Sequence, residues 1–226
     1  MRIGILQTGL APDPLVKDHG DYPQMFENLL AGNGFTFRTY RVVDGQFPAG
    51  VHDCDGWLIT GSRHGAYEDH PWIPPLEQFI RDAYGAHVPM VGICFGHQII
   101  AQAMGGKVEK FAGGWSTGAT QYDFEGEVMT LNAWHQDQVV TRPKGATVIA
   151  SNDFCENAAL LYDDRIFTLQ AHPEYDGAFI GGLVETRGKG VVPEQTLART
   201  RAHLGDPLDS QPMAKRIAAF FKAKHH

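Results

Sequence analysis

The sequence predicts an α/β fold: a mostly parallel central sheet with helices on both faces and an antiparallel extension. Short apolar segments, which we interpret as buried strands, alternate with segments of helical spacing in the amino-terminal part of the chain. Such alternation is typical of a parallel sheet that helices cover on both faces. Between residues 107 and 171 the pattern changes to short alternating strands and turns, which predicts the antiparallel extension of the same core.

The individual elements follow from these patterns. Strands are expected at residues 3–7, 35–43, 56–60, 88–93 and 165–171, and helices at 23–30, at 74–84 and from Cys94 to the pair Gly105-Gly106. The part from about residue 177 to residue 226 is read as helical, with breaks at Pro193 and Pro207. Because nothing marks a flexible linker, we expect one domain over residues 1–226.

Composition excludes several classes of protein. The chain has 226 residues, of which 43% are hydrophobic and 20% charged, as in ordinary soluble domains. No apolar run is long enough to span a membrane and no signal peptide precedes the first strand, so we expect a cytoplasmic protein. A net charge of −7 without a dense basic stretch argues against binding to nucleic acid.

The cysteines do not predict a metal site. There are three, with no C-x-x-C pair, which argues against a disulfide framework or a zinc site. Cys54 and Cys155 are read as structural thiols. No H-E-x-x-H or comparable ligand spacing is present, so we expect neither a metal nor a cofactor.

A short turn flanked by glycines carries the candidate nucleophile. Cys94 lies at the centre of Gly92-Ile93-Cys94-Phe95-Gly96, between an apolar segment and one with helical spacing. A strand-to-helix turn of this kind is strained around its central residue, so it needs small residues on both sides. It exposes the sulfur outside the sheet, and the N–H groups at the helix start favour a thiolate. We therefore predict that Cys94 is a reactive nucleophile.

His172 is the predicted base. It follows the expected strand 165–171, and groups at the carboxyl ends of parallel strands form the sites of α/β proteins. Glu174, two positions on, points the same way in an extended chain, and Pro173 keeps His172 extended. One short segment thus supplies a base and the carboxylate that orients it.

The other histidines are not expected to act. His97 lies on the helix that Cys94 opens, where an imidazole seldom reaches back to the turn. Five further histidines have no obvious acidic orienter at a useful spacing in a strand and are read as solvated or packed, namely His19, His64, His70, His87 and His203. His225 and His226 are read as a tail.

These residues resemble those of a known family. Segment 92–98, followed by His172-Pro173-Glu174, is similar to the class I glutamine amidotransferases, which release ammonia from the side-chain amide of glutamine. Segments 134–139, 145–151 and 155–172 are also similar, especially to stand-alone members related to the glutaminase domain of GMP synthase. The resemblance covers about residues 2–176 and implies a flavodoxin-like fold with the antiparallel extension.

The resemblance implies a role for each matching residue. Cys94 would attack the γ-carbonyl and form a γ-glutamyl thioester, His172 would carry the proton, and Glu174 would orient His172. The backbone N–H groups of Gly61 and Phe95 would form the oxyanion hole, worth about 3 kcal/mol per donor in well-studied enzymes.

The resemblance also implies where the substrate lies. Gln98 and the backbone around Trp134 and Gln136 would hold the glutamyl portion. The loop after Gly61 departs from the family pattern of two glycines and a proline and carries Arg63, whose guanidinium suits a carboxylate. An equally weighted interpretation is that Arg63 is a solvated charge of the loop rather than a partner for a carboxylate.

The overall reaction stays open at this point. The substrate is expected to be glutamine or another small γ-glutamyl compound. Either a separate synthase subunit uses the ammonia, or the protein acts alone on γ-glutamyl amide or peptide bonds. A third hypothesis is a noncatalytic binding module on the same fold, against which the residues Cys94, His172 and Glu174 argue.

Overall fold

The structure, a computed structural model, describes residues 1–225; of the predicted tail, His226 lies outside the described residues. The strands are β1 (Arg2–Leu6), β2 (Thr36–Tyr40), β3 (Gly56–Ile59), β4 (Met90–Ile93), β5 (Lys107–Lys110), β6 (Ser116–Phe124), β7 (Glu127–His135), β8 (Asp137–Thr141), β9 (Ala146–Ala150), β10 (Ala159–Tyr162) and β11 (Ile166–Leu169). The α-helices are α1 (Asp13–His19), α2 (Tyr22–Leu29), α3 (Ile73–Gly85), α4 (Phe95–Ala103), α5 (Gly177–Leu183), α6 (Glu194–Ala202) and α7 (Ser210–Lys222). A 3-10 turn, η1 (Val42–Asp44), and a π-helical turn, η2 (Val184–Gly188), complete the described elements.

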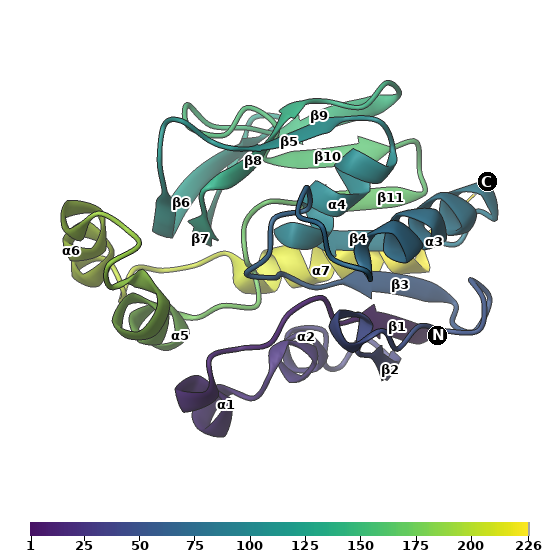
Figure 1. The fold of residues 1–226 in the computed structure, drawn as a ribbon, viewed down its shortest axis with the longest axis horizontal. Coiled ribbons are helices and arrows are strands. Elements are labelled where there is room, and N and C mark those ends of the chain that lie inside the picture. The colour runs from purple at the N-terminus through teal and green to yellow at the C-terminus, as the bar shows by residue number, and fades with distance from the viewer. Residues whose placement is uncertain (226) are drawn as a thin grey trace.

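The central sheet confirms the predicted fold class. Its seven strands have the order β2-β1-β3-β4-β11-β10-β9 (Figure 1). All neighbours from β2 to β11 are parallel, whereas β10 is antiparallel to both β11 and β9. Two antiparallel pairs, β5 with β8 and β6 with β7, lie beside this sheet. The predicted antiparallel extension is therefore part of the same core.

Two elements differ clearly from the expectation. The strand expected at 35–43 ends at Tyr40, because the chain turns into η1, which ends at Gly45 with a φ of 78°. Helix α1 was not expected, and none of its residues is buried. An exposed helix lacks the apolar stripe by which helical periodicity is recognised in a sequence.

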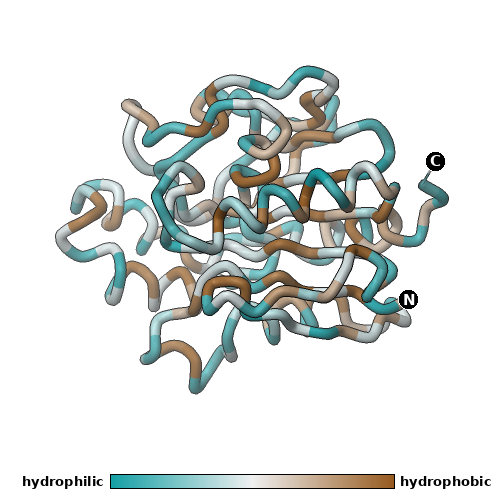
Figure 2. Tube along the Cα trace, turned by 45° about the vertical axis from the view of Figure 1, so that its right-hand side comes forward, coloured by the Kyte–Doolittle hydropathy of each residue, from teal (hydrophilic) through white to brown (hydrophobic). Residues whose placement is uncertain are grey.

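Two hydrophobic cores cover the two faces of the sheet. Trp57 and Ile59 of β3 pack with α3 and α4, whereas Leu58 between them packs with α2 and α7. Successive side chains of a strand point to opposite faces, which explains this division. Figure 2 shows the hydrophobic residues along the central strands, and Figure 1 shows helices on either side of them. The expected helices on both faces are thus present.

The candidate residues lie where parallel strands end. Gly61 follows β3, Cys94 follows β4, and His172 follows β11. These three strands are neighbours in the sheet, so their carboxyl ends meet at one edge. Strand β7 also reaches this edge, where the N–H of His172 donates to the carbonyl of Asn132 at 2.8 Å. Among the described residues, no helix has the length and apolar character needed to cross a membrane.

Candidate active site

The turn around Cys94 has the predicted strained geometry. Cys94 has a φ of 54° and a ψ of −102°, and its N–H donates to the carbonyl of Leu169 at 2.8 Å. A Cβ atom on Gly92 would lie 2.6 Å from the carbonyl oxygen of Gly96, and one on Gly96 would lie 2.3 Å from that of Ile59. Both distances are too short for a side chain, so the turn requires glycine on each side of Cys94.

His172 and Glu174 form a buried pair beside Cys94. Nδ1 of His172 lies 2.7 Å from Oε1 of Glu174, and both side chains are almost fully buried. Burial lowers the pKa of His172, but the negative charges of Cys94 and Glu174 outweigh it and raise that pKa to about 10. The structure thus brings together the three residues predicted as nucleophile, base and orienting acid, and it favours a charged imidazole among them.

Two other histidines near the site are buried. Nδ1 of His97 is 2.7 Å from Oγ1 of Thr168, and Nδ1 of His135 is 3.3 Å from the carbonyl oxygen of Asp137. Burial, and then the neighbouring histidine charge, lowers the pKa of each of them to about 3. Both therefore stay neutral at physiological pH, in contrast to His172. His97 is bound within the core, in agreement with its exclusion as the base.

Gly61 lies in contact with the predicted nucleophile and base. A Cβ atom on it would be 3.0 Å from Cε1 of His172 and 3.8 Å from Cβ of Cys94. Its carbonyl oxygen accepts hydrogen bonds from the hydroxyls of Thr8 and Thr60, at 3.2 and 3.0 Å. In the described part of the chain, the N–H groups of Gly61 and Phe95 have no hydrogen-bond partner. This arrangement is compatible with the predicted oxyanion hole, whose role stays a prediction.

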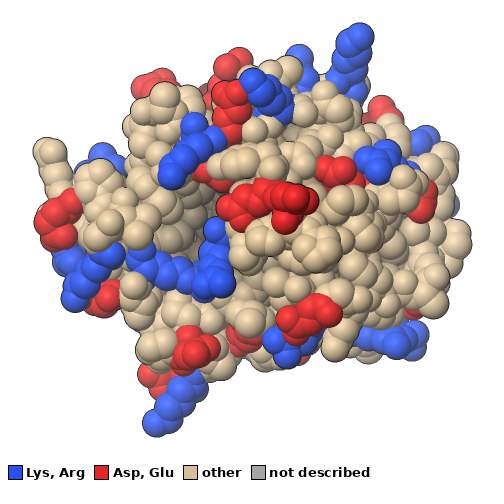
Figure 3. All heavy atoms as spheres, viewed as in Figure 1, with Lys and Arg blue, Asp and Glu red and all other residues tan. Residues whose placement is uncertain are grey.

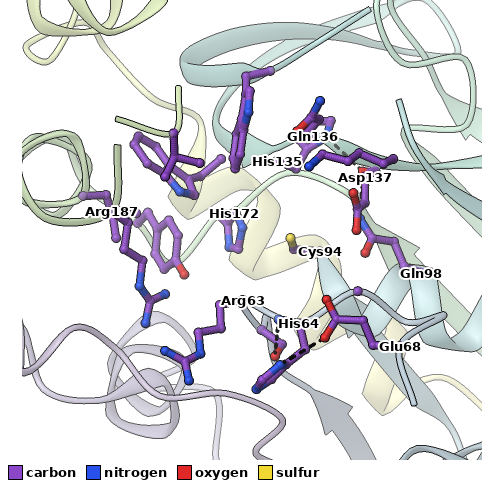
Figure 4. Close-up of a pocket in the computed structure, with 18 of the residues that line it drawn as sticks. Arg63, His64, Glu68, Cys94, Gln98, His135, Gln136, Asp137, His172 and Arg187 are labelled. Atoms are coloured by element: carbon purple, nitrogen blue, oxygen red, sulfur yellow. Dashed lines mark hydrogen bonds and ion pairs between the residues drawn. The ribbon is translucent and has the colours of Figure 1, made fainter. Parts of the chain in front are cut away.

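A pocket of about 380 Å³ opens over Cys94 and His172. Gln98, Trp134 and Gln136, the predicted substrate contacts, all line it. The side-chain amide group of Gln98 already donates hydrogen bonds within the protein. Its Nε2 donates to the carbonyl oxygen of Asp137 at 2.9 Å and to Oε1 of Gln170 at 3.1 Å. Figure 3 shows a hollow in this face of the molecule, and Figure 4 shows the residues around it.

Several lining residues were not expected from the sequence. Arg187 and Tyr22 reach the pocket from η2 and α2, and Nη1 of Arg187 donates to Oη of Tyr22 at 2.9 Å. Tyr175 stacks on His172, with 4.0 Å between the ring centroids. Tyr22 and Arg187 come from segments that carry no motif, so no local signal could have identified them, whereas Tyr175 directly follows the predicted His172–Glu174 segment. Arg63 also lines the pocket, as its place after Gly61 suggests.

One group of side chains has the composition of a metal site. The ligand atoms of His64, Glu68 and His70 lie within 4.8 Å of one another. Oε2 of Glu68 lies 3.3 Å from Nδ1 of His64 and 2.7 Å from Nε2 of His70. These two histidines thus have an acidic partner, which a loop rather than a strand brings near. His203 likewise pairs with Asp206 at 2.9 Å.

The sequence profile of the family described as Glutamine amidotransferase class-I matches residues 21–180. The chain belongs to this family. The matched range holds the predicted triad, Cys94, His172 and Glu174, and the loop at Gly61.

Relatives that resemble this chain differ in what their names describe. Gamma-glutamyl peptidase 4 of Arabidopsis thaliana is 30% identical, over 81% of this chain and 80% of its own length. One of the subunits of the glutamine-hydrolyzing GMP synthase of Halobacterium salinarum is 28% identical, over 71% of this chain and 87% of its own length.

A solved structure of a glutamine amidotransferase has the same fold. The crystal structure of a glutamine amidotransferase from Methylobacillus flagellatus matches with a TM-score of 0.73 and 23% identity, over 100% of this chain and 97% of the other. At this identity the comparison bears on the fold alone. Family membership and fold together are consistent with a cysteine hydrolase.

Proposed function

We propose that this protein hydrolyses γ-glutamyl amide bonds through a Cys94–His172–Glu174 triad. The observation that carries the proposal is the buried pair of His172 and Glu174, with 2.7 Å between Nδ1 and Oε1. This pair lies beside Cys94, which has a strained backbone and lines the pocket. A cysteine nucleophile needs a base, and the base needs a partner that sets its tautomer and stabilises its charge. The raised pKa of His172, about 10, supports this proposal, because it indicates an imidazolium that the neighbouring negative charges stabilise.

Acylation would proceed in two steps on these residues. The sulfur of Cys94 attacks the γ-carbonyl carbon of the substrate, and the carbonyl oxygen becomes an oxyanion near the N–H groups of Gly61 and Phe95. The C–N bond then breaks, and the leaving nitrogen takes a proton from Nε2 of His172. The products of this half-reaction are a γ-glutamyl thioester on Cys94 and a free amine, or ammonia when the substrate is glutamine.

Deacylation would reverse these roles with water. His172 takes a proton from a water molecule that attacks the thioester carbon, and the C–S bond breaks. Glutamate leaves, and Cys94 and His172 return to the state from which the attack began, with the proton on Nε2 of His172. Throughout, Glu174 keeps its bond to Nδ1 of His172, so Nε2 is the nitrogen that exchanges protons.

A second candidate function uses the same chemistry for a partner. One relative belongs to a GMP synthase, so this chain is also a candidate to deliver ammonia to a separate synthase subunit. The gamma-glutamyl peptidase relative favours the alternative, a hydrolase that acts alone. The two functions differ in a measurable way, because a partner-dependent glutaminase is nearly inactive by itself.

We further infer a reducing, cytoplasmic location. All three cysteines of the described chain are free thiols, and the proposed reaction requires Cys94 in its reduced form. Glutamate-containing amides of low molecular weight are the proposed substrates, with no nucleic acid involved.

The test is amine or ammonia release from the purified protein. Glutamine and a panel of γ-glutamyl peptides are supplied to the wild type, to Cys94→Ala and to Cys54→Ala, a buried free cysteine outside the pocket. We expect turnover in the wild type and in Cys54→Ala and none in Cys94→Ala. Turnover that survives in Cys94→Ala would contradict the triad. A folded wild type that acts only after a synthase partner is added would support the second candidate.

A further inference from the structure

Two arginines from distant parts of the chain border the pocket on one side. Arg63 lies in the loop after β3, two residues beyond Gly61, and Arg187 lies in the π-helical turn η2. Both also line a smaller adjoining cavity of about 300 Å³. Because the same two side chains line both cavities, they lie where the pocket continues away from Cys94. π-Helical turns are often found at functional sites, since they place a side chain outside the regular helical pattern.

The two guanidinium groups differ in how they are held. Nη1 of Arg187 donates to Oη of Tyr22 at 2.9 Å and Nη2 donates to the carbonyl of Leu10 at 2.6 Å. Tyr22 is buried, so its hydroxyl is a fixed acceptor that holds the orientation of the Arg187 guanidinium. Arg63 is exposed and has no hydrogen-bond or ion-pair partner within the described chain.

Neither positive charge is neutralised. The oxygens that hold Arg187 belong to a phenol and a backbone carbonyl, and no acidic side chain of the described residues forms an ion pair with either arginine. Asp13 lines the adjoining cavity without such a contact. Glu68, the nearby acid on the pocket wall, is engaged with His64 and His70. Two unpaired guanidinium groups that border a pocket favour an anionic group there, and the planar fork suits a carboxylate.

The position of the arginines assigns them to one part of the substrate. In Figure 4, Arg63 and Arg187 lie on one side of Cys94 and His172, whereas Gln98, Gln136 and Asp137 lie on the other. Gln98 and Gln136 lie on the side proposed for the glutamyl portion. The bond to be cleaved lies at Cys94, so the leaving amine extends toward the arginines.

We propose that Arg63 and Arg187 bind a carboxylate of the leaving amine. The preferred substrates are then γ-glutamyl amino acids or peptides with a free terminal carboxylate, rather than glutamine, whose leaving group is ammonia and has no carboxylate. This inference rests on the proposed function and deepens it, because it names the substrate class and the residues that select it. Arg63 supplies the movable contact, and Arg187 the fixed one.

The experiment compares substrates that differ only in that carboxylate. Values of kcat/KM are measured for γ-glutamyl-glycine, for γ-glutamyl-glycinamide and for glutamine. The enzymes are the wild type, Arg63→Gln, Arg63→Lys and Arg142→Gln. Arg142 is an exposed arginine that lines neither the pocket nor the adjoining cavity. For the wild type we expect the free acid to exceed the carboxamide by roughly tenfold or more, as for a charge-assisted contact.

The variants decide whether Arg63 causes the preference. We expect Arg63→Gln to reduce the ratio of free acid to carboxamide several-fold, mainly through KM, Arg63→Lys to restore part of it, and Arg142→Gln to leave it as in the wild type. Equal values for acid and amide in the wild type would overturn the inference. The inference would also be overturned if Arg63→Gln lowered kcat/KM for the free acid and for the carboxamide by the same factor.

A binding measurement separates this inference from the proposed function. Calorimetric titration of Cys94→Ala with the same acid and amide needs no turnover. The carboxylate site is supported if Cys94→Ala binds the free acid more tightly than the amide and if the double variant with Arg63→Gln does not. This holds even if the wild type hydrolyses nothing. Equal binding of acid and amide, together with Cys94-dependent hydrolysis, would leave the proposed function intact and refute the carboxylate site.

Discussion

The phenol ring of Tyr175 lies parallel to the imidazole of His172, with the ring centroids 4.0 Å apart and 7° between the planes. Glu174 holds the same imidazole at Nδ1, so one side chain fixes an edge of the ring and another covers a face. The two contacts leave His172 little freedom to turn. Three neighbouring positions of one short segment thus supply the base and both of its supports.

This stacking predicts a loss of rate when the ring at position 175 is removed. We expect Tyr175→Leu to lower kcat about tenfold, because a stacked pair contributes roughly 1 kcal/mol beyond burial and keeps the imidazole oriented. Tyr175→Phe retains the ring and is expected to stay within about twofold of the wild type. Steady-state kinetics on the best γ-glutamyl substrate checks this; equal losses in the two variants would show that stacking has no role.

Glu174→Gln should leave a folded but slow enzyme. The amide keeps the size of the side chain but removes the charge that stabilises the imidazolium, and comparable changes in triads cost ~10²- to 10⁴-fold in rate. The same substitution should lower the pKa of His172 from about 10, since the charge of Glu174 contributes to raising it. NMR titration of the His172 ring measures this pKa, and an unchanged value would refute the coupling.

The raised pKa of His172 also predicts how stability depends on pH. The folded protein holds this proton up to a pH of about 10, whereas an unfolded histidine releases it near 6.5. The stabilisation is therefore complete below pH 6.5 and is lost as pH rises toward 10. Denaturant unfolding of the wild type and of His172→Gln should give free energies that converge over this range. A constant difference between them would contradict the shift, and the exposed His203→Gln serves as a control.

His97 and His135 predict the opposite behaviour in acid. Their pKa values are lowered to about 3, so between pH 6.5 and 3 the unfolded chain binds protons that the folded chain excludes. Stability contributed by the two neutral rings is present above pH 6.5 and is lost as pH falls through this range. We expect His97→Gln to show a shallower decline of the unfolding free energy with falling pH than the wild type does. A parallel decline in the two proteins would count against the buried neutral state of His97.

The glycines of the nucleophile turn provide a test of packing. A Cβ atom on Gly96 would lie 2.3 Å from the carbonyl oxygen of Ile59, a backbone atom that cannot move alone. We expect Gly96→Ala to lower the free energy of unfolding by about 3 kcal/mol or more. Gly85→Ala, near the end of α3, meets no atom within 4 Å and should be neutral or slightly stabilising. Similar effects of the two substitutions on the unfolding midpoint would contradict this account.

The parts of the fold that the sequence predicted are those with local signals. Buried strands appear as short apolar runs, and the turn at Cys94 requires flanking glycines, so both can be recognised from neighbouring residues. The same holds for His172 and Glu174, which are two positions apart in an extended segment. Helix α1 was missed because none of its residues is buried, and hence it carries no apolar stripe.

By itself, the sequence determined the parallel sheet, the antiparallel extension and a cysteine turn followed by a histidine–carboxylate pair, since each depends on residues close together in the chain. Only the tertiary structure decided what surrounds them. Arg187 contacts Tyr22 from 165 positions away, and the N–H of His172 donates to the carbonyl of Asn132 on β7. Such contacts depend on how distant segments pack at the edge of the sheet, which no local periodicity or spacing encodes.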